Sequence, residues 1–370
     1  MQTLVLHAQS FDECWAHYYF WSDPEFLARL RSLGYALVLS RDASAAAIEG
    51  AAAVVYLEAS SFGAGRETRL AKLRRKLATR LRLPGIPPVR PWDPRPYRRP
   101  FALHAPGHPA FLDARGRPRI LLALEGVMHA PDDYNPEARR HFDRILTWHD
   151  GLQEPGRTVV FRVPQPGSWP AIAAPPFAAR KLLASISANK RVKHPLELYT
   201  ERRRALARLS RAIPAQFDFY GMGWEGTRLA RSPCFRGEAR DKAEIYARYR
   251  FALVYENAQV PGYVSEKIFD AMRSGTVPVY LGAPNVEAYV PASCFVDRRR
   301  FASDRALAGF LGAVSEERYA EYLAAIRAWL AGDGFRPFLA ASLADALAAA
   351  ADGLRPSTRA PASSYPAAAR

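Results

Sequence analysis

The sequence contains little cysteine. Three of its 370 residues are cysteines, and they are odd in number and widely spaced, at Cys14, Cys234 and Cys294. Small secreted modules held together by disulfides need many paired cysteines, so this class of protein is excluded. Reduced thiols in the cytoplasm are the simpler interpretation.

The sequence also lacks long hydrophobic runs. No window reaches the roughly 18 uninterrupted apolar residues that a membrane-spanning helix needs. The opening residues Met1–His7 show no basic flank followed by a long apolar stretch, so we expect no signal peptide. We therefore predict a cytoplasmic protein, and peripheral association with the inner face of an anionic membrane stays open.

Motifs for metals and dinucleotides are missing or incomplete. His104 and His108 are interrupted by Pro106, and no other His or Cys has metal-ligand spacing. The stretch Gly221–Gly226 matches the pattern G-x-G-x-x-G, but Pro233 prevents the helix that a dinucleotide site needs. There is no P-loop and no Asp-x-Asp pair. The sequence therefore predicts no NAD and no metal.

Positive charge, by contrast, is abundant. The chain has 52 Lys and Arg against 36 Asp and Glu, a net charge of +16. Its 49% hydrophobic and 12% aromatic residues exclude an intrinsically disordered protein. Much of the excess lies between Arg66 and Arg99, where twelve basic residues face two acidic ones. A leucine stripe predicts an amphipathic helix in the first half of the segment 66–100, and Pro84–Pro100 reads as an extended proline-rich arm.

Three interpretations of this basic segment compete. The helix could pack on a domain core by its leucine stripe while its charges face water, it could lie on an anionic membrane, or it could bind nucleic acid. The segment contains no nucleic-acid-binding motif and few aromatics, so nucleic acid is the least favoured partner.

Strand and helix patterns alternate along the chain, which predicts a parallel α/β fold. In the first half, strands are expected at 3–8, 35–40, 51–57, 120–124 and 158–163, and helices at 26–33 and 136–146. In the second half, strands are expected at 181–187, 217–220, 251–255 and 276–281, and helices at 196–212, 242–250, 265–274 and within 303–352. We predict two doubly wound Rossmann-like domains, 1–176 and 177–352, facing each other across a cleft, and a disordered tail at 353–370.

Functional side chains follow the strand predicted at 251–255. Glu256 and Asn257 come directly after it, at the end where ligands bind in open α/β sheets. The next predicted helix begins with Glu266 and Lys267 in its first turn, where unpaired amides attract phosphate. Lys267 would add a full positive charge, and Glu266 could accept hydrogen bonds from sugar hydroxyls. Taken alone, the two residues could equally form an ordinary charged first turn.

Four short motifs lie close together in this region. They are Tyr255-Glu256-Asn257, Tyr263-Val264-Ser265-Glu266-Lys267, Gly275-Thr276-Val277-Pro278-Val279 and Pro291-Ala292-Ser293-Cys294-Phe295-Val296. Together they resemble the signature region of the family-10 glycosyltransferases, the α-1,3/4-fucosyltransferases. The resemblance implies a GT-B fold and an inverting, metal-independent transfer of fucose from GDP-fucose to a hydroxyl of a glycan or glycolipid acceptor, such as a surface-polysaccharide or lipopolysaccharide precursor.

The resemblance also implies roles for individual residues. Donor contacts fall on Tyr263, Glu266 and Lys267, with Asn257 nearby and Glu256 and Ser265 as further candidates. An arginine on the helix at 196–212 is expected at the diphosphate. Arg202 is the first candidate, and Arg203 and Arg204 are the alternatives.

A general base is expected on the other domain. Glu125 ends the strand predicted at 120–124, although Gly126 follows it where the family has Ser-Pro. Asp132 and Asp133 are the backup bases, and a plain surface carboxylate at position 125 is the alternative. Two other functions stay open: transfer of a different nucleotide-activated sugar, including another GDP-hexose, and a non-catalytic module that binds polyanions.

Overall fold

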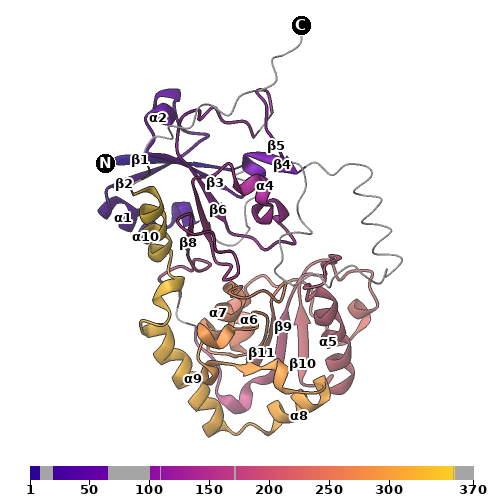
Figure 1. Ribbon diagram of the computed structural model, residues 1–370. Helices are drawn as coiled ribbons and strands as arrows, with labels where there is room; N and C mark the ends of the chain where they lie inside the picture. Colours follow the sequence, from indigo (N-terminus) through magenta and orange to yellow (C-terminus); the bar gives the residue numbers. More distant parts are fainter. Residues whose placement is uncertain (9–19, 66–100, 109, 171, 353, 355–370) are drawn as a thin grey trace. The chain divides into compact units, whose positions relative to one another are not determined.

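The computed structural model describes residues 1–8, 20–65, 101–108, 110–170, 172–352 and 354. Two compact units divide the chain: residues 1–167 together with 339–370, and residues 168–338 (Figure 1). The predicted basic helix and arm at 66–100, Cys14, and the predicted tail at 353–370 apart from residue 354 lie outside the described residues.

The first unit is built on a parallel sheet of six strands in the order β2-β1-β3-β6-β7-β8. These are β1 (Gln2–His7), β2 (Tyr35–Leu39), β3 (Ala53–Leu57), β6 (Arg119–Ala123), β7 (Arg144–Thr147) and β8 (Thr158–Val160). A separate antiparallel pair joins β4 (Gly63–Gly65) to β5 (Phe101–Leu103). Strand β3 is buried along its whole length, as expected for a central strand of a parallel sheet covered on both faces.

Four α-helices are described in this unit: α1 (Pro24–Ser32), α2 (Ala45–Glu49), α4 (Pro136–Arg139) and α10 (Ala340–Ala351). The helix predicted at 136–146 is wrong beyond its first turn. Ile145 and Leu146 belong instead to β7, where they pair with Leu121 and Leu122 of β6. Pairing in a buried sheet outweighs the weak helical pattern of this stretch.

The second unit contains a parallel sheet of five strands in the order β10-β9-β11-β12-β13. These are β9 (Lys181–Ile186), β10 (Phe217–Tyr220), β11 (Tyr249–Tyr255), β12 (Val277–Leu281) and β13 (Val296–Asp297). The helices are α5 (Tyr199–Ala212), α6 (Lys242–Ala247), α7 (Glu266–Arg273), α8 (Asp304–Ala313) and α9 (Glu316–Ala331). The helix predicted at 242–250 is therefore too long, because Tyr249 already pairs with Lys181 in the sheet.

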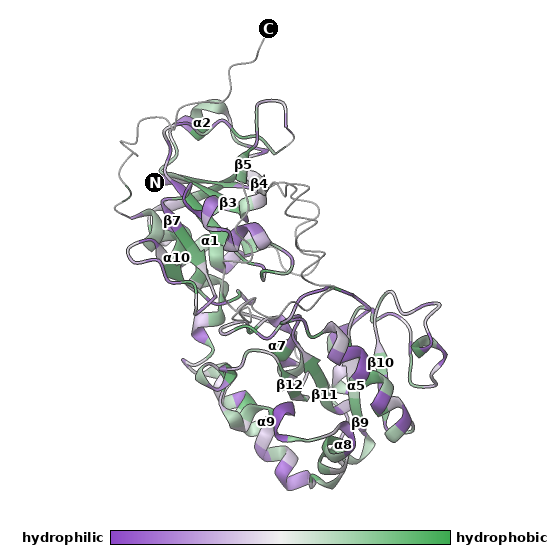
Figure 2. Ribbon diagram, turned by 45° about the vertical axis from the view of Figure 1, so that its right-hand side comes forward, coloured by the Kyte–Doolittle hydropathy of each residue, from purple (hydrophilic) through white to green (hydrophobic). Residues whose placement is uncertain are grey.

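Short 3-10 turns link the elements of both units. They are η1 (Phe20–Ser22), η2 (Ala59–Ser61), η4 (Pro131–Tyr134), η5 (Phe177–Ala179), η6 (Leu229–Arg231), η7 (Val286–Ala288), η8 (Ala292–Cys294), η9 (Arg298–Arg300) and η10 (Arg336–Phe338). Figure 2 colours the central strands β3, β11 and β12 as hydrophobic, and most of their residues are buried. Among the described residues, no helix is long and apolar enough to cross a membrane.

The predicted domains differ from these units at both ends. The boundary expected at 176 lies at 167, and α10, expected in the second domain, belongs to the first unit. It packs against α1, where Arg29 pairs with Asp345 at 2.7 Å. The Leu343 and Leu347 side chains on its apolar face are buried. An apolar face needs a partner surface, and α1 is a partner that local sequence does not reveal.

Candidate active site

The predicted base, Glu125, lies just past the end of β6. It is 6% exposed, so the interpretation as a plain surface carboxylate is wrong. Its Oε2 atom accepts the Gly126 N–H at 3.1 Å and lies 3.4 Å from Nδ1 of His129. The Tyr134 hydroxyl donates to the Glu125 carbonyl at 2.8 Å. The side chain is thus held in place at the carboxyl end of the first sheet.

The two backup bases lie in η4. Asp133 is fully buried, and its Oδ1 atom accepts the Ala59 N–H at 2.6 Å. Its Oδ2 atom is buried without a hydrogen-bond partner. Burial raises the pKa of Asp133 well above the ordinary value, and the neighbouring Glu58 charge adds to this effect. Burial therefore favours the protonated form of the Asp133 carboxyl group.

Glu58 was not predicted as a site residue. It follows β3, and its backbone φ of 61° and ψ of 152° lie in a region that glycine alone adopts readily. Burial, with the Glu125 charge second, raises the pKa of Glu58 to about 8. The one available sequence signal was its position directly after the strand at 51–57, the same placement that singled out Glu256.

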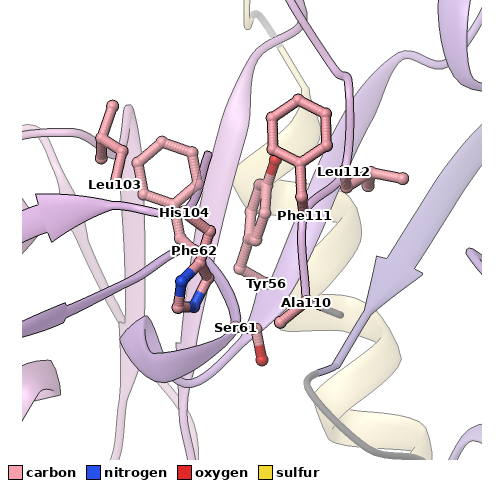
Figure 3. A pocket seen from close by; sticks show the side chains of 8 residues that line it. All are labelled: Tyr56, Ser61, Phe62, Leu103, His104, Ala110, Phe111 and Leu112. Atoms are coloured by element: carbon pink, nitrogen blue, oxygen red, sulfur yellow. The ribbon is translucent and has the colours of Figure 1, made fainter. Parts of the chain in front are cut away.

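A small pocket of the first unit opens beside η2 (Figure 3). It is lined by Tyr56, Ser61, Phe62, Leu103, His104, Ala110, Phe111 and Leu112. None of the predicted site residues is among them. The rings of His104 and His108 stack at 3.8 Å, and within the described ranges no group of three or more His, Cys, Asp or Glu side chains is arranged to hold a metal ion.

The predicted donor residues gather where β11 ends and α7 begins. Glu256 is fully buried, and its carboxylate accepts the Ser265 N–H at 2.8 Å and the Ser265 hydroxyl at 2.7 Å. Gly282 comes directly after β12. A Cβ atom at this position would collide with the side chains of Glu256 and Tyr280. Glu256 therefore ties the strand end to the helix start.

Lys267 lies beside this carboxylate. Its Nζ atom is 2.9 Å from the Ser265 Oγ, 3.2 Å from Oε1 of Glu266 and 3.4 Å from Oε2 of Glu256. Burial favours the neutral amine, but the two carboxylates raise the pKa of Lys267 above the ordinary value. The side chain is 25% exposed, so a fixed cation is available at the N-terminus of α7.

Glu266 provides the matching anion. Burial would raise the pKa of its carboxyl group, yet the Lys267 and Lys242 charges together lower it to about 2. The side chain is about one-third exposed and ionised at neutral pH, so it can accept hydrogen bonds from hydroxyl groups.

One of the three candidate arginines reaches this region. Arg202 of α5 is buried, and its Nη2 atom donates to the carbonyls of Tyr255 at 2.5 Å and Glu256 at 2.9 Å. Burial lowers the pKa of Arg202, but an arginine keeps its charge in proteins. Arg203 instead donates to the Lys190 carbonyl, and Arg204 is exposed on the helix.

Asn257 and Tyr263 complete the cluster. The Asn257 Nδ2 atom lies 3.4 Å from the Tyr263 hydroxyl and its Oδ1 atom 3.5 Å from Nη2 of Arg202. Tyr263 is 4% exposed, and its carbonyl accepts the hydroxyl of Tyr280. Tyr280 was missed because no motif separates it from an ordinary strand residue.

Sequence comparison finds a family match within the second unit. Residues 179–331 match the pattern of glycosyltransferase family 10 (fucosyltransferase), C-terminal part. We refer to the matched residues 179–331 as the family-10 domain. It contains every predicted donor residue, from Arg202 to Lys267.

Curated relatives match a short part of the chain. Alpha-(1,3)-fucosyltransferase 7 of Homo sapiens is 47% identical over 81 residues, which cover 21% of this chain and 24% of that protein. Alpha-(1,4)-fucosyltransferase of Arabidopsis thaliana is 39% identical over 89 residues, covering 24% and 22%. The chain thus spans less than a quarter of the length of these relatives.

Solved structures are similar in fold to nearly the whole chain, not to the family-10 domain alone. A crystal structure of an alpha1,3-fucosyltransferase aligns with a TM-score of 0.53 and 15% identity, covering 96% of this chain and 91% of that one. HepE of Anabaena, solved with UDP and glucose, aligns with a TM-score of 0.51 and 14% identity over 96% and 100%. The predicted α/β fold of the GT-B type, with two Rossmann-like units, is confirmed.

The G-x-G-x-x-G stretch is a turn. After β10 the chain runs from Gly221 through a loop to η6, so no α-helix begins at this stretch. Gly221 has a φ of 137°, and a side chain there would collide with the Ser187 backbone. The glycine is therefore explained by a close backbone approach inside the family-10 domain.

Proposed function

We propose that the protein is a glycosyltransferase that moves fucose from GDP-fucose to a hydroxyl group of an acceptor glycan, with inversion at the sugar carbon and without a metal ion. The observation that carries the proposal is the network of Glu256, Ser265 and Lys267 at the start of α7, within a family-10 domain. A crystal structure of an alpha1,3-fucosyltransferase with GDP-fucose has the same fold, at a TM-score of 0.52.

The donor diphosphate would bind at the N-terminus of α7. The Ser265 hydroxyl donates to Glu256 and does not cap the helix, which leaves the first-turn amides to an anionic ligand. Lys267 adds a cation at the same place, and charge that develops on the departing GDP is stabilised by such preorganised groups. Glu266 and Asn257 are the groups for sugar and ribose hydroxyls.

Glu125 would act as the general base in the first unit. Its carboxylate takes the proton of the acceptor hydroxyl while the acceptor oxygen forms a bond to the anomeric carbon of fucose. The bond between that carbon and the phosphate oxygen breaks on the opposite side, and its electron pair leaves with GDP. Attack from the face opposite the leaving group inverts the sugar carbon.

Nucleotide binding tests the donor assignment. We expect GDP to raise the melting temperature, and UDP, CMP and NAD to raise it less. Lys267→Ala should abolish the GDP shift, because it removes the cation beside the α7 amides. Lys181→Ala is the matched control: this lysine is also paired with a carboxylate, Asp218 at 2.6 Å, but begins β9 at the other end of the sheet. An unchanged GDP shift in Lys267→Ala would overturn the donor assignment.

Transfer itself tests the base. We expect Glu125→Gln to keep the GDP shift and to lose nearly all transfer, because the amide cannot accept the proton. Full activity of this variant would exclude Glu125 and direct the test to Asp132 and Asp133.

A different donor is the second candidate, favoured by the similar fold of HepE with UDP and glucose. A larger melting-temperature shift with UDP than with GDP would select it. A non-catalytic polyanion-binding module would instead bind anionic polymers in a salt-sensitive manner without nucleotide preference.

The net charge of +16 supports an acceptor on or near an anionic surface, such as a glycolipid precursor of a surface polysaccharide. Binding to vesicles with and without anionic lipid tests this part of the proposal, because electrostatic attraction requires the anionic lipid.

A further inference from the structure

Three carboxyl groups come together at the carboxyl end of the first sheet. Strands β3 and β6 are parallel neighbours, with Leu57 opposite Leu122. Glu58 and Glu125, which follow these strands, therefore emerge at the same edge. Asp133 joins them from η4 through its bond to the Ala59 amide. We refer to Glu58, Glu125 and Asp133 as the carboxyl triad.

The backbone at Glu58 is strained. A positive φ of 61° with a ψ of 152° is unfavourable for any residue with a side chain, and Glu58 is the single non-glycine residue with positive φ in the described part of the chain. Hydrogen bonds on both sides hold the conformation, since the Glu58 N–H donates to the Leu122 carbonyl at 3.1 Å and the next N–H, that of Ala59, donates to Asp133 at 2.6 Å. Strain of this kind persists where the surrounding structure enforces a particular side-chain position.

Two members of the triad carry buried oxygen atoms without partners. These are Oε1 of Glu58 and Oδ2 of Asp133. Asp133 is fully buried, and the charge of Glu58 acts on it more strongly than any other charge. If both carboxylates were ionised, they would repel each other. One proton held between them removes this repulsion and provides the hydrogen-bond donor that the two buried oxygen atoms lack.

Glu125 differs from the other two members. Its carboxylate receives the Gly126 amide and lies beside the His129 ring, and both contacts suit the anion. The triad therefore separates into Glu58 and Asp133, which each have a buried oxygen atom without a partner, and Glu125, whose carboxylate accepts a backbone N–H.

We propose that Glu58 and Asp133 share a proton and that this neutral face of Glu58 positions the Glu125 carboxylate for the transfer reaction. The proposal rests on the proposed role of Glu125 as the base. Glu58 is a positioning residue, because it acts through Glu125 and needs no contact with the acceptor.

The proposal makes the site sensitive to alkaline pH. The pKa of Glu58 is raised to about 8, so above this pH a second negative charge faces Glu125 and repels it. Three titratable groups interact electrostatically with Glu58 and set this balance: Glu125, Asp133 and Tyr134. Around them lie His129 beside Glu125, Asp132 acting on Asp133, and Arg139 acting on Tyr134. Lys267 does not titrate in this range, because its pKa is raised.

The pH profile of transfer is the main test. For the unaltered protein we expect kcat/KM to fall above about pH 8, by about ten-fold for each pH unit. Glu58→Gln should remove this alkaline limb, because the amide stays neutral. Asp133→Asn should move the limb to lower pH, because it replaces a like charge by a donor. Glu49→Gln, at an exposed glutamate of the same unit, should leave the limb in place.

If Glu58 and Asp133 had a purely structural role, the substitutions would leave the alkaline fall in kcat/KM at the same pH. An alkaline limb that persists unchanged in both Glu58→Gln and Asp133→Asn would overturn the proposal. The GDP-induced melting shift is measured in parallel, and we expect it to be the same in all of these variants, since they lie outside the family-10 domain.

A stability measurement tests the shared proton without any transfer activity. A carboxyl group whose pKa is raised on folding stabilises the fold below its unfolded pKa, and this stabilisation is lost as pH rises towards the folded value. The melting temperature of Glu58→Gln minus that of the unaltered protein should therefore rise between pH 5 and about 8 and then level off. A difference independent of pH would overturn the proton-sharing pair, whereas absence of transfer with every nucleotide sugar would contradict the proposed function alone.

Discussion

At the scale of single residues, the proposed donor site depends on a buried carboxylate rather than on the exposed charges. Glu256 is fully buried and holds the amide and hydroxyl of Ser265, and Ser265 in turn contacts Lys267. A helix N-terminus with a fixed cation is thus held by one side chain that itself needs no contact with the ligand.

Glu256→Gln should therefore destabilise the protein. The amide of glutamine can accept one of the two Ser265 hydrogen bonds but cannot neutralise the positive charge of Lys267. We therefore expect a loss of about 1–3 kcal/mol in the free energy of unfolding. Denaturant titration measures it. Glu225→Gln, at an exposed loop position, should change stability by less than about 0.5 kcal/mol. Equal effects of the two substitutions would show that the buried contact contributes nothing.

Backbone strain at Glu58 leads to a second residue-scale prediction. Glu58→Gly and Glu58→Ala both remove the carboxyl group, but glycine alone tolerates the observed φ of 61°. We expect the glycine variant to be more stable than the alanine variant by about 1–2 kcal/mol, the reverse of the usual order. Both should lose transfer by roughly ten- to a hundred-fold, because the base is no longer positioned. Higher stability of the alanine variant would contradict the strain.

At the scale of elements, local patterns predicted several regular segments of the second unit well. Helix α5 and strands β9, β10 and β12 begin and end within three residues of the predicted positions. The error at 136–146 arose in a short stretch with no strong period. There α4 ends at Arg139 and the chain enters the sheet at Arg144.

At the scale of the whole molecule, residues distant in sequence build one unit. Helix α10 comes last among the described elements but completes the first unit, and the Tyr35 hydroxyl donates to Asp352 at 2.6 Å. The first unit therefore depends on residues from both ends of the chain.

Leu347→Ala tests this arrangement. Leu347 is fully buried, so its truncation should cost about 2–5 kcal/mol, and the loss should fall on the first unit. Hydrogen exchange resolves the two units: we expect faster exchange in β1 and β3 and unchanged exchange in β9 and β11. Leu103→Ala, at a leucine that is 38% exposed, should have a smaller effect. Faster exchange confined to the second unit would contradict the assignment of α10.

The sequence by itself determined the parallel α/β class, most of the strands and helices, and which residues gather where β11 ends and α7 begins. These depend on residues close together in the chain, as with Glu256 and Lys267, whose side chains are separated by a single loop. The tertiary structure alone decided which of Arg202, Arg203 and Arg204 reaches that cluster, where α10 packs, and that Glu58 joins Glu125 and Asp133. The physical reason is the same in each case: pairing of strands and burial of helix faces bring distant residues into contact, and no local pattern encodes that choice.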